Sequence, residues 1–319
     1  MMAIKHQSLR IVFAGTPAFG LPCLDALHAS QHQLVGIYTQ PDRPAGRGKH
    51  PQCSAVKTWG AAHHIPVHQP LNFKDVETQN RLAAIKPDLM IVIAYGLILP
   101  ASVLAIPQFG CINVHASILP RWRGASPIQQ ALLHGDTKTG ITIMQMNEGM
   151  DTGEIFTMIT TPITSKDNAQ SVHDRLSTLS CAPLLETINN IARCGAQTTP
   201  QPSTGITYAP KIKKSDAIIH WQTPSSDIDC MIRAFNPWPI AQTYAQHQPL
   251  RIHEAHVVKQ QTTSTPGTIL SLDKTGLLVA TAKDCLKITK LQWPGGKVIS
   301  VADYQNSARR DLEPGTILK

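Results

Sequence analysis

The stretch CINVHASILPRWRG (111–124) begins as an apolar run typical of a buried strand and ends in a basic turn. Side chains in a strand alternate between its two faces, so Ile112 and Val114 share one face while Asn113 and His115 share the other. A buried amide or imidazole without a hydrogen-bond partner costs about 1–3 kcal/mol. The polar face therefore predicts either a site open to a ligand or, alternatively, an internal network around a structural histidine.

Similar short, β-rich runs surround this stretch between residues 9 and 193, and amphipathic segments separate several of them. The runs are LRIVFAG, QLVGIYT, DLMIVIAYG, CINVHAS and ITIMQM. This alternation predicts an α/β fold with a Rossmann-like parallel sheet. The first strand closes at Gly15, but no GxGxxG follows, which argues against a dinucleotide site.

The composition changes after residue 193. We expect a first domain over residues 1–193 and a linker rich in Pro, Thr and Gln over 194–214. Short strand patterns between turn signals follow, including LRIHEAHVV, GTILSLD, GLLVATA and CLKITKLQW, with one helical stretch at SSDIDCMIRAF. They predict a small, OB-like β-barrel domain over residues 215–319.

Charge and cysteine usage limit the function classes. The chain has 29 Lys and Arg against 21 Asp and Glu, and residues 206–319 hold 14 against nine, which favours an anionic partner such as nucleic acid or a polyglutamylated or phosphorylated small molecule. The seven cysteines form no CxxC pair, so a disulfide framework or zinc ribbon is not expected. HHIPVH (63–68) lacks the further ligands of a metal site, and no metal is expected. Without a signal peptide or apolar span, we expect a cytoplasmic protein that does not enter membranes.

A second polar position lies in GITIMQMNEGMDTGEIF (140–156), where a strand pattern runs into a loop that carries Asp151. Gly149 and Gly153 allow the backbone to turn sharply on either side of the acid. The loop could therefore return Asp151 to the end of the neighbouring strand; the alternative is a surface turn.

NVHASILPRWRG, with MDTG downstream, resembles the signature of the folate-dependent formyltransferases, which transfer a formyl group from 10-formyltetrahydrofolate to an amine. In place of the family's Ser-Leu-Leu-Pro segment this chain has an Ile at the second position, a conservative change. The resemblance implies a catalytic set of Asn113, His115 and Asp151, and a folate-contacting segment of Ser117, Ile118, Leu119 and Pro120.

The chemistry of formyl transfer fits these residue types. The reaction needs stabilisation of a developing oxyanion and proton delivery to the departing nitrogen. Asn113 offers an amide donor, and His115 can donate a hydrogen bond and move a proton. Asp151 would orient the imidazole and favour its charged form.

Further segments are more similar to the family members that act on methionyl-tRNA than to those that act on glycinamide ribonucleotide. These are LRIVFAGTP, TQPDRPAGRGK, AYGLILP, GASPIQQALLHGD, ITIMQM and IRAFNPWP. The resemblance implies that the acceptor is an initiator methionyl-tRNA, which the C-terminal domain helps to hold. It also implies tRNA contacts by Arg43, Arg47 and Lys49 in one loop and by Lys211 in the linker.

Two alternatives remain open. One is a formyltransferase that acts on a small amine, such as a nucleotide-linked amino sugar. The other is a non-catalytic tRNA-binding protein on the same scaffold. Nothing in the sequence indicates an obligate protein partner.

Overall fold

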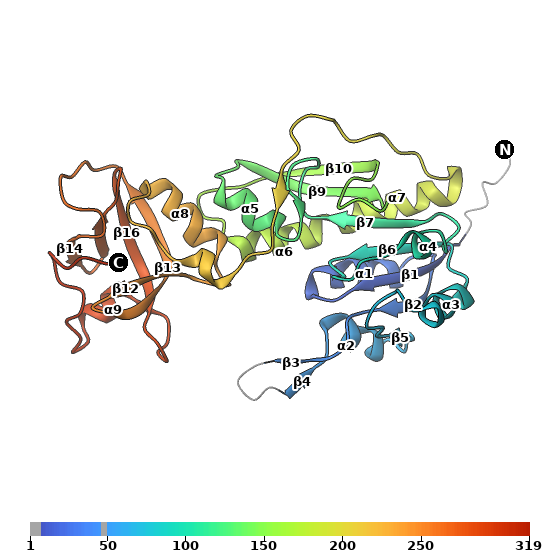
Figure 1. Ribbon diagram of the computed structural model, residues 1–319, viewed down its shortest axis with the longest axis horizontal. Coiled ribbons are helices and arrows are strands. Elements are labelled where there is room, and N and C mark those ends of the chain that lie inside the picture. The colour runs from blue at the N-terminus through green and yellow to red at the C-terminus, as the bar shows by residue number, and fades with distance from the viewer. Residues whose placement is uncertain (1–7, 46–49) are drawn as a thin grey trace. The chain divides into compact units, whose positions relative to one another are not determined.

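The computed structural model describes residues 8–45 and 50–319, which divide into two compact units (Figure 1). Unit 1 comprises the described residues of Met1–Gly124 together with Thr139–Thr161 and His173–Tyr208. Unit 2 comprises Ala125–Lys138, Pro162–Val172 and Ala209–Lys319. The predicted domain boundaries at residues 193 and 214 stay predictions.

Unit 1 is built from alternating strands and helices. Its helices are η1 (Ala18–Gly20), α1 (Leu21–His28), α2 (Ala55–Ala62), α3 (Val76–Ile85), α4 (Ala101–Leu104), α6 (Ala169–Leu179) and α7 (Cys181–Cys194). Its strands are β1 (Arg10–Gly15), β2 (Gln33–Tyr38), β3 (Arg43–Ala45), β4 (His50–Gln52), β5 (Val67–His68), β6 (Leu89–Ile93), β7 (Cys111–His115), β8 (Arg123–Gly124), β9 (Lys138–Gln145) and β10 (Ile155–Pro162). The two-residue strand β11 (Tyr208–Ala209) spans the boundary between the units, and β9, β10 and α6 also cross such a boundary.

The main sheet of unit 1 has the strand order β10-β9-β7-β6-β1-β2-β5. Strands β1, β2, β5, β6 and β7 pair in parallel, as the sequence predicts. Strand β9 differs, because it pairs with β7 antiparallel, with His115 opposite Thr142. Its apolar, β-branched composition identifies a buried strand but carries no information about strand direction.

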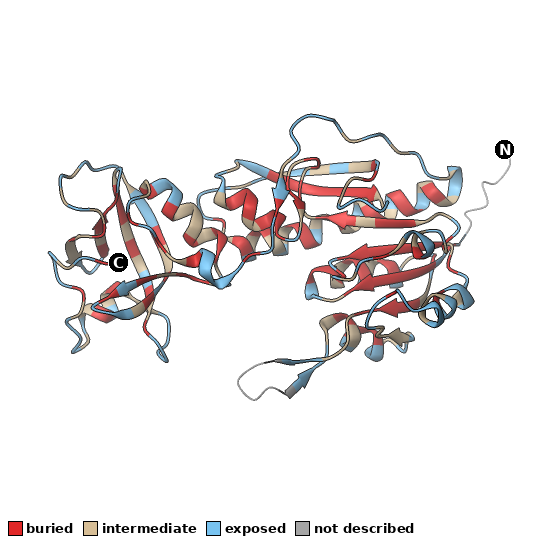
Figure 2. Cartoon of the chain, viewed as in Figure 1, coloured by how far each residue is buried: buried red, intermediate tan, exposed pale blue. Residues whose placement is uncertain are grey.

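The inner strands are buried on both faces, which explains their continuous apolar sequences. Every residue of β6 is buried, and so is β1 after its first residue (Figure 2). The turn after β1 requires glycine, since a Cβ at Gly15 would lie 2.6 Å from the Phe13 ring and 2.8 Å from the Ile93 carbonyl oxygen.

The parallel pairing brings the carboxyl ends of β1, β2, β6 and β7 to one edge of the sheet. Ligands of open α/β sheets bind at this edge. A hydrogen bond of 2.7 Å between the Thr39 and Ser54 hydroxyls holds the loop after β2, and Ser54 also caps α2 by accepting from the Lys57 amide.

Unit 2 contains an antiparallel sheet domain, which confirms the predicted β-rich C-terminal fold. Its strands are β12 (Ala241–Ala245), β13 (Gln248–Val258), β14 (Ile269–Asp273), β15 (Gly276–Ala280), β16 (Cys285–Gln292) and β17 (Ile299–Ser300). They follow the order β12-β13-β16-β15-β14, with β17 paired to β16. The helices of unit 2 are α5 (Pro127–Leu133), η2 (Lys214–Ala217), α8 (Ser225–Ala234), at the predicted position, and α9 (Val301–Gln305).

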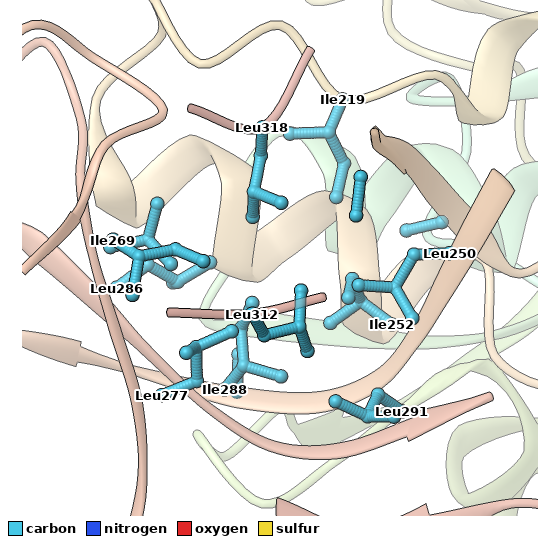
Figure 3. Packing of buried hydrophobic residues seen from close by; sticks show 14 of the residues in the cluster. Ile219, Leu250, Ile252, Ile269, Leu277, Leu286, Ile288, Leu291, Leu312 and Leu318 are labelled. Carbon is cyan, nitrogen blue, oxygen red and sulfur yellow. The ribbon is translucent and has the colours of Figure 1, made fainter. Parts of the chain in front are cut away.

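The core of unit 2 is made of aliphatic side chains from these strands and from the segments that return to them. Leu250 and Ile252 of β13, Leu277 of β15 and Ile288 of β16 lie together (Figure 3). All four are 0% exposed. Burial of this cluster is the main stabilising contribution to the sheet domain. Within the described part of the chain, no helix combines the length and apolarity needed to cross a membrane.

We predict that Ile252→Ala destabilises unit 2 by about 2–5 kcal/mol, since it removes a fully buried side chain and leaves a cavity. Urea unfolding followed through Trp221 and Trp293, both in the same cluster, measures the change. Val257→Ala is the matched control on the same strand, because Val257 is 37% exposed, and should shift stability by no more than about 0.5 kcal/mol. Equal effects of the two changes would contradict the assignment of the core.

Candidate active site

Asn113 and His115 lie in the second half of β7, at the carboxyl edge of the sheet. Strand alternation places both side chains on one face, as predicted. The His115 side chain is 6% exposed, and its Nε2 lies 2.9 Å from the Trp122 carbonyl oxygen. Because a carbonyl only accepts, Nε2 carries a proton and donates it. This bond fixes the ring and leaves Nδ1 as the nitrogen available for proton exchange.

Asp151 lies opposite His115. One carboxylate oxygen, Oδ2, is 3.6 Å from His115 Nδ1 and accepts a 2.7 Å hydrogen bond from the Gly124 amide. The other, Oδ1, accepts from Asn113 Nδ2 at 3.4 Å. The carboxylate is therefore held at both oxygens, and the three residues singled out from the sequence lie in one cluster.

The loop between β9 and β10 carries Asp151 back to β7. The Gln145 amide donates to the Glu154 carbonyl at 2.8 Å and closes the loop at its base. A Cβ at Gly153 would lie only 1.6 Å from the Gln145 carbonyl oxygen, so the approach of the two loop arms requires glycine. Asp151 itself has a φ of 53°, a conformation that Asp and Asn tolerate better than most residues.

Gln201 is a site residue that the sequence analysis missed. Its Nε2 donates to the backbone carbonyls of Asp151 and Gly153, both at 2.8 Å. Its Oε1 accepts from Arg123 Nη2 at 2.7 Å and from Nε at 3.2 Å. Gln201 thus connects the Asp151 loop to β8. It lies in the Pro- and Thr-rich segment predicted as a linker, where no periodicity or motif distinguishes it.

The segment that follows His115 is tightly packed. The Ser117 hydroxyl donates to the Arg121 carbonyl at 2.6 Å, and the Leu119 amide donates to the Thr142 hydroxyl at 3.1 Å. Ser117, Leu119 and Pro120 are buried, and Leu119 packs with Met144 and Ile155.

Ile118 is the half-buried member of the predicted folate segment. A more accessible apolar side chain, Ile98, follows β6 at the same edge of the sheet and is 90% exposed.

The predicted tRNA-contacting cations fall in different parts of the chain. Arg43 begins β3 and is exposed, whereas Arg47 and Lys49 lie outside the described residues. Lys211 is exposed in unit 2.

The root of the loop that carries Arg43 is held by Asp42. Its carboxylate accepts from Lys57 Nζ at 2.6 Å and from Gln69 Nε2 at 2.8 Å. The hydrogen bond from Lys57, followed by that from Gln69, lowers the pKa of the Asp42 carboxyl below its ordinary value. This contact fixes where the strand of Arg43 leaves the sheet.

Two of the three histidines of HHIPVH stack on aromatic rings, and His64 is exposed. His63 stacks on Trp59 with ring centroids 3.9 Å apart, and His68 stacks on Tyr38 at 4.8 Å. Among the residues with described positions, no group of three or more His, Cys, Asp or Glu side chains is arranged to hold a metal ion.

Comparison with known proteins confirms the resemblance. Profiles described as formyl transferase and formyl transferase, C-terminal domain, match residues 9–188 and 211–309. The chain is 55% identical to the methionyl-tRNA formyltransferase of Legionella pneumophila (strain Paris), over 98% of this chain and 100% of that protein. It is 48% identical to the protein of the same name from Hydrogenovibrio crunogenus, over 93% and 96%.

A solved structure shares the fold at low sequence identity. It is the N-formyltransferase of Helicobacter canadensis in complex with folinic acid and dTDP-3-aminofucose, with a TM-score of 0.67 and 15% identity over 88% of this chain and 99% of that one. The two profiles together with the near-full-length identities decide the family. The chain belongs to the formyl transferase family, and the relatives that match it over nearly its whole length are named methionyl-tRNA formyltransferase.

Proposed function

We propose that this protein transfers a formyl group from 10-formyltetrahydrofolate to the amino group of an initiator methionyl-tRNA. The observation that carries the reaction is the meeting of Asn113, His115 and Asp151 at the carboxyl edge of the sheet. The acceptor is supported by 55% identity to a methionyl-tRNA formyltransferase over its entire length. Such an activity belongs in the cytoplasm and requires neither a metal nor a membrane.

Each of the three side chains has a distinct task in this proposal. Asn113 Nδ2 is an amide donor for negative charge that develops on the formyl oxygen. His115 Nδ1, the nitrogen not engaged by Trp122, exchanges the proton that must pass from the attacking amine to the departing nitrogen. Asp151 Oδ2 faces Nδ1 and stabilises the imidazolium that forms when His115 takes up this proton.

The folate supplies the formyl group when bound, and the residues at the edge fit an apolar ring system. Ile118 is half-buried and Ile98 is 90% exposed, so both offer apolar surface to a ligand. Ser117, Leu119 and Pro120 would act by shaping this segment, because their side chains are buried.

The tRNA contacts are proposed for the four cations predicted from the sequence. Arg43 and Lys211 are exposed and can reach phosphates. Arg47 and Lys49 follow Arg43 by four and six positions in the sequence. The excess of positive charge after residue 206 supports a contribution of unit 2 to the same polyanion.

One assay tests the proposal against both alternatives. The protein is incubated with 10-formyltetrahydrofolate and either methionyl-tRNA, uncharged tRNA, free methionine or a nucleotide-linked amino sugar. We expect formylation of methionyl-tRNA alone. Formylation of the sugar would support the small-amine enzyme, and tRNA binding without any product would support the non-catalytic protein.

We predict that Asp151→Asn and His115→Ala each lower kcat by about 10² or more, since both residues act on the proton in transit. Binding of tRNA should change little. Steady-state kinetics and a filter-binding measurement separate the two effects. Glu148→Gln, an exposed change in the same loop, is the control and should retain activity. Near-normal kcat in either variant would refute the assigned roles.

Gln201→Ala should lower kcat by about tenfold to 100-fold, because it releases the Asp151 backbone from a fixed position. The KM for tRNA should remain within about twofold if binding and transition-state effects are separate. The exposed Gln197→Ala, in the same segment, serves as the matched control. An unchanged kcat for Gln201→Ala would contradict the positioning role assigned to Gln201.

Arg43→Gln and Lys211→Gln should each make the slope of log K against log salt for tRNA binding shallower by about 0.7–0.9, since each variant neutralises one phosphate fewer. Folate affinity should not change. Lys86→Gln is the control, because Lys86 is exposed where α3 ends, before the amino end of β6 and away from the site edge. If both Arg43→Gln and Lys211→Gln keep the wild-type slope, the contacts must be made by other cations.

A further inference from the structure

Two cysteines that the proposed reaction does not use lie together in unit 1. Cys23, in α1, is 0% exposed, and Cys181, the first residue of α7, is half-buried. Their sulfur atoms are 3.9 Å apart, although the residues are 158 positions apart in the chain. Cys181 thus retains partial exposure to solvent, whereas Cys23 has none.

The surroundings of the pair differentiate the two thiols. Cys23 Sγ lies 3.1 Å from the Ser180 hydroxyl oxygen, whose own proton is donated to the Ser177 carbonyl at 2.7 Å. The Ser180 hydroxyl oxygen therefore accepts, and the single Cys23 proton is shared between it and Cys181 Sγ. Cys181 Sγ lies 3.6 Å from the Ser177 carbonyl oxygen. The sulfur atoms are thus held close by contacts from the corner between α6 and α7.

The electrostatics favour Cys181 as the reactive member. The hydrogen bond with Cys23 lowers the pKa of the Cys181 thiol, whereas the same bond and burial raise the pKa of Cys23. A half-accessible thiolate next to a resolving thiol is the arrangement of a redox-sensitive site.

From this geometry we propose that Cys23 and Cys181 form a reversible oxidative modification site, which hydrogen peroxide converts into a disulfide. In the first step the Cys181 thiolate attacks one peroxide oxygen and the O–O bond breaks, which gives a sulfenic acid and, with one proton, water. In the second step the Cys23 sulfur attacks the Cys181 sulfur. The S–S bond forms, and the sulfenic OH group leaves with the Cys23 proton as water. Two electrons pass from the two thiols to peroxide, and a thiol reductant reverses the change.

The cysteine pair lies where α1 and α7 meet, next to the turn that follows β1. The Ser177 hydroxyl donates to the Phe19 carbonyl at 2.6 Å, so the α6–α7 corner already contacts the turn between β1 and α1. The disulfide would add a covalent link between α1 and α7 at the same place. This inference rests on the thiol geometry alone and does not depend on the proposed formyl transfer.

The test uses the full-length, reduced protein, treated with hydrogen peroxide, blocked with N-ethylmaleimide and digested with trypsin for mass spectrometry. We expect one cross-linked peptide pair that contains Cys23 and Cys181 and disappears after treatment with dithiothreitol. Oxidation confined to the exposed Cys53 and Cys194, with Cys23 and Cys181 recovered as thiols, would overturn the proposal.

Single variants assign the two roles. In Cys23→Ser, and equally in Cys23→Ala, Cys181 should stop at the sulfenic acid and be trapped by dimedone. In Cys181→Ser, oxidation of the remaining Cys23 should be slower by about tenfold or more, because its thiolate fraction is low. Cys194→Ser is the control and should form the same cross-link at the wild-type rate. Equal rates in the wild type and Cys181→Ser, or a cross-link to Cys194, would reject the pair, and circular dichroism confirms that each variant is folded.

Discussion

The hydrogen bond from the Gly124 amide to Asp151 joins three segments that the chain order separates. It fixes the β9–β10 loop against β8, and β8 follows the turn whose Trp122 carbonyl holds the His115 ring. Because Asp151 Oδ2 accepts from a backbone amide, the course of the main chain fixes where this oxygen lies. The distance from Asp151 to His115, and the direction in which Asn113 points, both follow from that position.

The Gly124 bond depends in turn on packing at the end of the sheet. Gln201 holds the Asp151 backbone from one side and the Arg123 guanidinium from the other. The Trp122 amide donates to the Thr207 hydroxyl, and the Arg123 amide to the Thr207 carbonyl, both at 2.9 Å. The segment from 201 to 207 therefore acts as a brace for the site, although its sequence is polar and rich in turn residues. Preorganisation of this kind lets a site act without reorganising during the reaction.

The buried strands and the polar face of β7 could be predicted from the sequence because each has a local signal, whereas the grouping of Asn113, His115 and Asp151 into one set came from the resemblance to the formyltransferases. Buried parallel strands are continuous apolar runs, and a polar residue at a strand end marks the functional edge. The direction of β9 and the role of Gln201 could not be predicted. Strand direction is set by pairing with β7, and Gln201 acts through contacts with residues 48 to 78 positions away in the chain. Neither property can be recognised from the amino-acid composition or from the periodicity of hydrophobic residues.

The backbone of Asp151 has a consequence for how this position can vary. With a φ of 53°, the residue lies in a region that Gly, Asn and Asp occupy at lower cost than most other residues. Of these three residues, Asp alone carries a negative charge. A glutamate would preserve the charge but combine backbone strain with a carboxylate one methylene further out. The backbone conformation and the need for a negative charge therefore both favour aspartate at this position.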